Sequence, residues 1–230
     1  MSEGRRRRLA GARLLREIFV VVSSILIAFA LDAWWDGRAA RRTEAAHLRS
    51  LRSDFEQNVE RLRQLIAMEE QVSDASRRLL LAAGSDAAVP QDTLRRLLRR
   101  VFNSARFDPV MGGYQAVVGS GGLAQITDDS LRKALAGFAS LLESRYSERY
   151  SDELYFDFIR SFTGRLGMTA AALRPGTAAE DAPVRRLIAD DKFREHLALR
   201  HFAERDVARA YRALLAQAER VLALLPRPDS

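Results

Sequence analysis

Cysteine is absent from this chain of 230 residues, and lysine nearly so, because only Lys133 and Lys192 are lysines among 37 basic residues. Without cysteine there is no disulfide and no thiolate metal site, and such a chain is compatible with either side of a membrane. No stretch of alternating polar and apolar residues is long enough to indicate a β-strand, and the sequence contains no internal repeat. We therefore predict an all-α protein.

The common motifs of catalysis and metal binding are missing as well. There is no Gly-x-Ser-x-Gly sequence, and His196 and His201 are five residues apart, which places them on different faces of a helix. Gly119–Gly122 lacks the lysine and the preceding strand of a phosphate-binding loop, so it predicts a tight connection between helices. We therefore expect no catalytic residue, no metal and no cofactor, and we predict that the protein is not an enzyme.

The longest apolar stretch runs from Ile18 to Trp35 and carries no charge before Asp32. As a helix that rises about 1.5 Å per residue it spans roughly 27 Å, close to the roughly 30 Å hydrocarbon core of a bilayer. Tandem tryptophans at its end are typical of a membrane interface. We predict a transmembrane helix over 18–35, with its main lipid contacts at Ile18, Phe19, Leu26, Phe29, Leu31, Trp34 and Trp35.

Other interpretations of this stretch are open. Ala28-Phe29-Ala30 fits a signal-peptide cleavage site, although the tandem tryptophans and the continuing helical pattern favour a retained anchor. The uncharged part is also short enough for a buried helix of a soluble protein. Asp32 is either an ion or proton site or, as we favour, an interfacial residue beside Asp36 and near Arg38.

Positive charge is concentrated near the N-terminus. Residues 1–42 carry nine arginines and four acidic residues, a net charge of +5, which leaves +2 of the total +7 for the remainder. Arginines are more numerous before the apolar stretch than just after it, which favours a cytoplasmic N-terminus and a domain in the periplasm or exterior. The nearly balanced remainder gives no reason to expect a nucleic-acid partner. The predicted domains are a basic tail (1–17), the transmembrane helix (18–35) and a helical extramembrane domain (36–230).

A helical pattern continues after the apolar stretch to about Ala83. Its apolar stripe consists of Leu48, Leu51, Phe55, Val59, Leu62 and Ile66. A strict heptad repeat would place Asn58, Glu69 and Ser76 in a coiled-coil core, so we favour a helix packed on its own domain. Self-association near the membrane stays open.

Further helices are expected over 92–102, 114–118, 127–162 and 191–225, with a short turn at 184–188. The expected N-caps are Asp92, then Thr127 or Asp128, then Asp190 or Asp191, which favours a capping role over acid–base chemistry for the acidic pairs. The predicted architecture is a membrane helix that continues into a long helix, packed in an antiparallel helical bundle.

Aromatic residues concentrate between Tyr146 and Phe162, a segment that holds six of the 16 phenylalanines and tyrosines. Their helical spacing favours a place in the core. The alternative is the wall of a ligand pocket.

Several motifs together resemble the DUF6090 family, single-pass bacterial membrane proteins that carry a domain of unknown function. The resemblance covers about residues 14–142 and implies a helical protein tethered to the bacterial inner membrane, with no known activity. The matching residues are Arg16 and Glu17 before the apolar stretch with Trp34 and Trp35 after it; Leu48, Leu51, Asp54, Phe55 and Asn58; Tyr114, Val117, Ser120, Gly121, Gly122, Leu123 and Ile126; and Asp128, Leu131 and Leu135.

Two hypotheses follow from the motifs and the missing catalytic groups. Asp54 and Asn58 lie one turn apart and are expected to form a buried polar link to the Ser120–Gly122 turn, the alternative being a solvated helix face. For the function, we expect a non-enzymatic envelope protein that acts as a scaffold through protein contacts. Its expected partners are membrane lipid and a second copy of the chain or another membrane protein. The alternative is a ligand-sensing extracytoplasmic domain with a pocket near Tyr146–Phe162.

Overall fold

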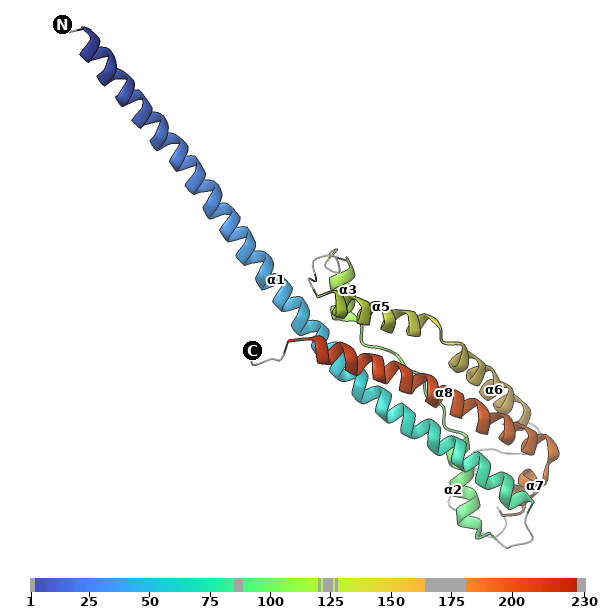
Figure 1. Ribbon diagram of the computed structural model, residues 1–230. Coiled ribbons are helices and arrows are strands. Elements are labelled where there is room, and N and C mark those ends of the chain that lie inside the picture. The colour runs from blue at the N-terminus through green and yellow to red at the C-terminus, as the bar shows by residue number, and fades with distance from the viewer. Residues whose placement is uncertain are drawn as a thin grey trace. The chain divides into compact units, whose positions relative to one another are not determined.

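The computed structural model describes residues 3–84, 89–119, 121, 126, 128–163 and 181–226; within them the side chains of 3–21, 24, 25, 40, 163, 181–183 and 185 are not described. Every regular element of this part of the chain is a helix (Figure 1), so the all-α prediction is confirmed. The helices are α1 (Glu3–Ala83), α2 (Gln91–Val101), α3 (Gly112–Gly119), α5 (Asp129–Glu143), α6 (Tyr146–Thr163), α7 (Asp181–Ala189) and α8 (Asp191–Leu224).

Several helix ends follow the expected signals. α1 ends at Ala83, and the carboxylates of Asp128 and Asp190 accept hydrogen bonds from the first amides of α5 and α8. These caps satisfy amides that have no partner inside their own helix. The Gly121 backbone has a φ of 70°, which favours glycine, as expected for a tight connection.

Three expectations about the helices were wrong. Pro90 rather than Asp92 is the N-cap of α2, the short turn at 184–188 is part of the nine-residue α7, and the helix expected over 127–162 is divided into α5 and α6. Arg145 lies at this division. Its side chain donates to the carbonyl of Leu142 (3.1 Å) and to that of Phe107 (2.8 Å), so it satisfies a carbonyl that the end of α5 leaves without a helical partner.

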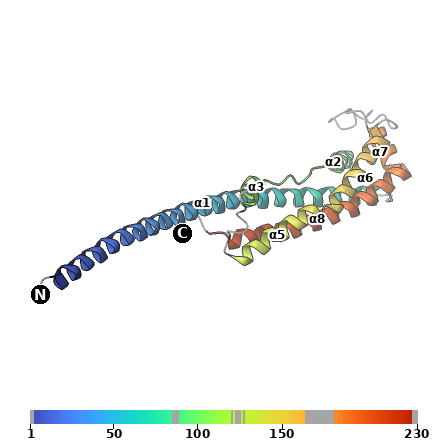
Figure 2. The ribbon, with the colours of Figure 1, turned by 90° about the horizontal axis from the view of Figure 1, so that it is seen from above.

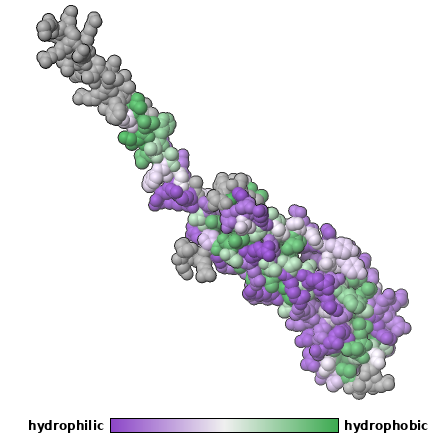
Figure 3. Space-filling view, in the orientation of Figure 1, coloured by the Kyte–Doolittle hydropathy of each residue, from purple (hydrophilic) through white to green (hydrophobic). Residues whose placement is uncertain are grey.

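The chain forms two compact units, residues 1–49 and 50–230. In the first unit α1 carries an exposed apolar band, visible as a hydrophobic region in Figure 3. The side chains of Leu26, Phe29, Leu31, Trp34 and Trp35 are between 52% and 68% exposed. Apolar side chains gathered at this density on a surface are typical of a site that another molecule covers.

The described helices give no support to the transmembrane part of the fold prediction. No helical stretch among the described residues combines the length and the apolar character that crossing a bilayer requires. Ile18 and Phe19, the first two predicted lipid contacts, lie outside the described side chains.

The second unit is built around two long antiparallel helices, the α1 residues from Ser50 onward and α8 (Figures 1 and 2). Arg63 of α1 pairs with Glu219 of α8 (2.7 Å), whereas Ser73, further along α1, contacts His201, nearer the start of α8 (2.9 Å). This opposite order shows that the two helices are antiparallel. α5, α6 and α7 all pack against α8, and α2 packs against α7.

The buried face of α1 follows a regular step of three and four residues. Its members are Leu51, Phe55, Asn58, Leu62, Leu65, Glu69, Val72, Ser76 and Leu79, each less than 9% exposed. α1 therefore packs on its own domain, as we favoured. Asn58, Glu69 and Ser76, which a strict heptad repeat would place in a coiled-coil core, lie inside this stripe within the domain.

Candidate functional site

A buried ion pair lies in the core of the second unit. Arg200 and Glu204 lie one turn apart on α8, with side chains only 2% and 3% exposed, and their Nη2 and Oε1 atoms are 3.0 Å apart. Nη2 of Arg200 also donates to the carbonyl of Asn103 at 3.0 Å. The guanidinium carbon lies 5.0 Å from the ring centre of Tyr155 and 5.9 Å from that of Phe158, so two aromatic faces share in stabilising the buried cation.

Glu69 of α1 brings a second carboxyl group to this pair. Burial, together with the nearby charge of Glu204, raises the pKa of Glu69 from 4.5 to about 9. Glu69 is therefore protonated at neutral pH and donates a hydrogen bond to Glu204, since two buried carboxylates beside a single guanidinium would repel each other. Ser151 of α6 donates to the other oxygen of Glu204 at 2.9 Å.

A second polar group lies one turn earlier on α6. The hydroxyl of Tyr211 donates to Oε1 of Glu148 at 3.1 Å, and the amide of Phe107 lies within 3.2 Å of both of these oxygens. Burial first, and then the Glu148 carboxylate, raise the pKa of Tyr211 above its ordinary value. Arg145 reaches Glu148 at 3.4 Å from the surface side. We call the set Glu69, Glu148, Ser151, Arg200, Glu204 and Tyr211 the core polar network.

The spacing along α6 explains how this helix serves both polar and apolar parts of the core. Glu148, Ser151, Phe158 and Phe162 are each at most 8% exposed, whereas Tyr146 and Tyr150 stack on each other at the surface. Phe158 and Phe162 pack against Phe193 with ring centres 5.6 and 5.2 Å away. The aromatic rings of this segment therefore supply core and surface in the described part of the domain.

Asp54 and Asn58 are both buried, and they bind the backbone at the start of the glycine-rich segment. Oδ2 of Asp54 accepts from the amides of Gly113 (2.6 Å) and Tyr114 (3.3 Å) at the start of α3. Asn58 makes a two-way bond to Val110, with its amide nitrogen 2.8 Å from the carbonyl and its oxygen 2.7 Å from the amide nitrogen. The carboxylate thus caps α3 from a neighbouring helix.

These bonds lie before the turn that the sequence indicated. Ser120 and Gly122, two of the predicted partners, lie outside the described residues. Gly113 shows why the segment approaches α1 so closely, because a Cβ atom built there would lie 2.7 Å from the backbone of Ser50. A larger residue would force the two backbones apart.

The histidines are used in packing. His196 lies 3.7 Å from Asp157 and contacts the rings of Phe158 and Phe162, whereas His201 faces α1. Oγ of Ser73 lies 2.9 Å from Nδ1 of His201, but its hydroxyl donates to the His201 carbonyl at 3.0 Å. Since Nδ1 is also 3.1 Å from the Ser73 carbonyl, the pair forms a clamp between α1 and α8.

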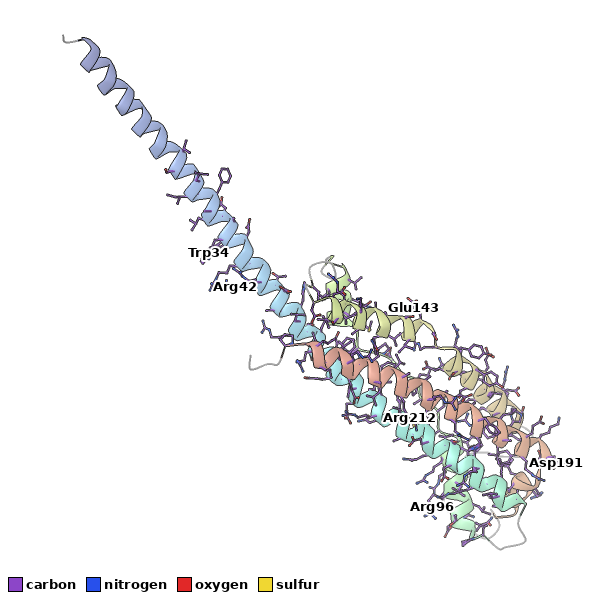
Figure 4. All side chains as sticks on the ribbon, viewed as in Figure 1. Trp34, Arg42, Arg96, Glu143, Asp191 and Arg212 are labelled. Atoms are coloured by element: carbon purple, nitrogen blue, oxygen red, sulfur yellow. The ribbon has the colours of Figure 1, made fainter. Side chains whose placement is uncertain are left out.

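Two depressions border this part of the domain. One, of about 530 Å³, lies beside the junction of α5 and α6 and reaches Glu148; Figure 4 labels Glu143 on its wall. The other, of about 390 Å³, lies between α1 and α8, where Arg212 is labelled. Among the described residues, no group of three or more His, Asp or Glu side chains is arranged to hold a metal ion.

The fold and the core polar network define an all-helical protein with buried charges between its helices. The chain belongs to the family described as "Family of unknown function (DUF6090)", which matches residues 17–173. This confirms the resemblance seen in the sequence motifs. Neither a curated protein nor a solved structure matches the chain.

The core polar network was not predicted from the sequence. Glu69 and Glu148 both carried a detectable signal, because each falls on the inward step of its helix where an apolar residue is usual. Arg200 and Glu204 carried the complementary signal of opposite charges one turn apart. Such pairs are common on helix surfaces, so this signal alone does not indicate burial.

Proposed function

We propose that the protein is a membrane-tethered scaffold, whose apolar band inserts in a lipid bilayer and whose helical domain binds other proteins without catalysing a reaction. The observation that carries this proposal is the exposure of the band on α1, with Phe29 at 68% and Trp35 at 65%. Water is a poor solvent for such a surface, whereas lipid can cover it because a helix satisfies its own backbone hydrogen bonds. The uncharged sequence from Ile18 to Leu31 extends the same band.

The distribution of charge supports one orientation. With more arginines before the band than just after it, the N-terminus lies in the cytoplasm of a bacterium and the helical domain lies in the periplasm or exterior. The band itself crosses the inner membrane as a single helix over 18–35. The partners are then membrane lipid and a second copy of the chain or another membrane protein, with no nucleic acid and no cofactor.

Alkaline carbonate extraction of cell membranes tests the tether. Leu26→Arg with Phe29→Arg places two charges in the band. Each arginine near the centre of a bilayer raises the free energy of membrane insertion by about 2.5–3.5 kcal/mol. We expect the unaltered chain to stay in the membrane pellet and this variant to move to the supernatant. Ala39→Arg with Thr43→Arg adds the same charge at exposed positions of α1 beyond the band and should stay in the pellet. Release of the unaltered chain by carbonate would overturn the tether.

The absence of cysteine allows a direct test of sidedness. Ser140→Cys lies on an exposed position of α5, and Ser2→Cys lies in the basic tail. A membrane-impermeant maleimide is expected to label Ser140→Cys in cells with a permeabilised outer membrane, and Ser2→Cys only after lysis. The reverse pattern would place the domain in the cytoplasm.

Exposed apolar side chains of the second unit motivate the protein-binding part of the proposal. Tyr146 is 71% exposed and Phe202 is 62% exposed. A photocrosslinking amino acid at either position in living cells is expected to give discrete adducts, and an adduct of doubled mass would identify a second copy. The same group at the exposed Arg220 serves as the control. Yields no higher than at Arg220 would contradict binding through these residues.

A further inference from the structure

The depression between α1 and α8 is rich in arginine. Its volume is about 390 Å³, and Arg77, Arg205, Arg209 and Arg212 line it together with two acidic residues. Three of these arginines come from α8 at steps of four and three residues, so they form a row along one side of that helix. We call this feature the arginine groove.

The groove exists because small residues meet at its floor. Ser73 of α1 is 4% exposed and Ala208 of α8 is 1% exposed, and a longer side chain at either position would fill the space. The Ser73–His201 clamp joins the two helices there, with the hydroxyl 3.0 Å from the His201 carbonyl. The floor is therefore part of the folded core and not a gap between movable surface side chains.

The two acidic residues of the groove do not neutralise all four of its arginines. Asp74 is held between Arg77 (2.9 Å) and Arg78 (2.7 Å), and Glu70 pairs with Arg212. Arg205 makes no ion pair or hydrogen bond among the described residues. Its neighbour Arg209 pairs only with Asp206, which does not line the groove.

We infer that the arginine groove binds a multiply charged anion of the phosphate class. Guanidinium groups present planar sets of donors that match phosphate oxygens, and an anion removes the mutual repulsion of neighbouring arginines. Arg205 and Arg209, the two α8 arginines without an acidic partner in the groove, are four residues apart, roughly 6 Å along the helix. Each can bind one phosphoryl group of an anion that has two linked phosphoryl groups. The inference is independent of the membrane tether.

Inorganic pyrophosphate is the probe, titrated by calorimetry against the full chain in nanodiscs of phosphatidylcholine. The test variant is Arg205→Gln with Arg209→Gln. The control is Arg194→Gln with Arg220→Gln, which removes the same charge from exposed positions of α8 outside the groove. We expect the test variant to bind at least tenfold more weakly and the control to stay within twofold. Unchanged thermal unfolding of both variants shows that they are folded.

Glycerol 3-phosphate, which represents the head portion of an anionic phospholipid, distinguishes two sources of the anion. Binding at least tenfold weaker than pyrophosphate supports a soluble ligand with two phosphoryl groups, and comparable binding supports a lipid headgroup held through the same arginines. If the unaltered chain does not bind pyrophosphate, the inference is overturned. Equal losses in the test variant and the control overturn it too, since binding would then follow the net charge alone.

Discussion

The two units of this protein place their side chains in opposite ways. In the first unit, the apolar side chains of Phe29 and Trp35 are exposed. In the second unit, the ionisable side chains of Glu69, Arg200 and Glu204 are buried. Each arrangement is unfavourable unless a partner compensates for it. Most polar groups of the core polar network have partners within the domain, although Nε and Nη1 of Arg200 have no hydrogen-bond partner among the described residues. The apolar band has no partner among the described residues. The buried charges of the second unit are therefore compensated largely within the fold, whereas compensation of the exposed band requires the lipid that we propose.

The largest effect is expected from breaking the buried ion pair. Arg200→Met leaves the Glu204 carboxylate buried without its guanidinium, which costs about 3–5 kcal/mol of unfolding free energy. Urea unfolding followed by circular dichroism measures this. Arg194→Met, an exposed position on the same helix, should change it by less than about 0.5 kcal/mol. A loss below about 1 kcal/mol for Arg200→Met would show that Glu204 does not depend on this partner.

The close approach of α3 to α1 gives the next effect. Gly113→Ala puts a Cβ atom 2.7 Å from the Ser50 backbone and disturbs the hydrogen bond to Asp54. We expect it to lower the free energy of unfolding by about 1–3 kcal/mol. Gly112→Ala is the matched control, because a Cβ there meets nothing within 4 Å. The same urea experiment compares the two variants. Equal stability of both would mean that the contact between the backbones is looser than described.

A smaller and pH-dependent effect is expected at Glu69. Its pKa rises from 4.5 to about 9 on folding, so above pH 4.5 the unfolded chain releases a proton that the folded chain keeps. The contribution of Glu69 to stability therefore falls as pH rises from about 4.5 to about 9, and Glu69→Gln removes this contribution. The variant should therefore gain stability relative to the unaltered chain as pH rises from about 5 to about 9, with a difference that grows by at most about 1.4 kcal/mol per unit.

Glu70 supplies the control for this experiment. It is the next residue on α1, it is exposed, and it pairs with Arg212. Glu70→Gln should show no such rise in relative stability between pH 5 and pH 9. A flat difference for Glu69→Gln over the same range would mean that Glu69 is ionised in the folded protein.

Local patterns in the sequence were sufficient for much of the second unit. The end of α1 at Ala83 and the caps at Asp128 and Asp190 follow from signals within a few residues. The division at Arg145 was missed, and the Arg145 side chain there donates to the carbonyl of Phe107, a residue distant in sequence. Periodicity cannot show which distant backbone an arginine will reach.

The polar residues of the core also have partners that the sequence pattern alone could not identify. The motif containing Asp54 and Asn58 pointed to the glycine-rich segment, and their bonds are to Val110, Gly113 and Tyr114 at the start of it. Glu69 served as an argument against a coiled-coil core, but its burial within the domain was not predicted. Its partner Glu204 lies on another helix, and a shared proton allows both acids to be buried. Burial of an acid depends on such tertiary partners and not on spacing.

The exposed band on α1 is the feature on which the account rests, and maleimide labelling in native membranes tests it most directly. Phe29→Cys lies within the band, and Ala39→Cys lies at an exposed position beyond it. We predict that a water-soluble maleimide labels Ala39→Cys in membranes opened on both sides and leaves Phe29→Cys unlabelled until detergent denaturation. Equal labelling of the two cysteines in intact bilayers would show that water reaches the band and would contradict the account.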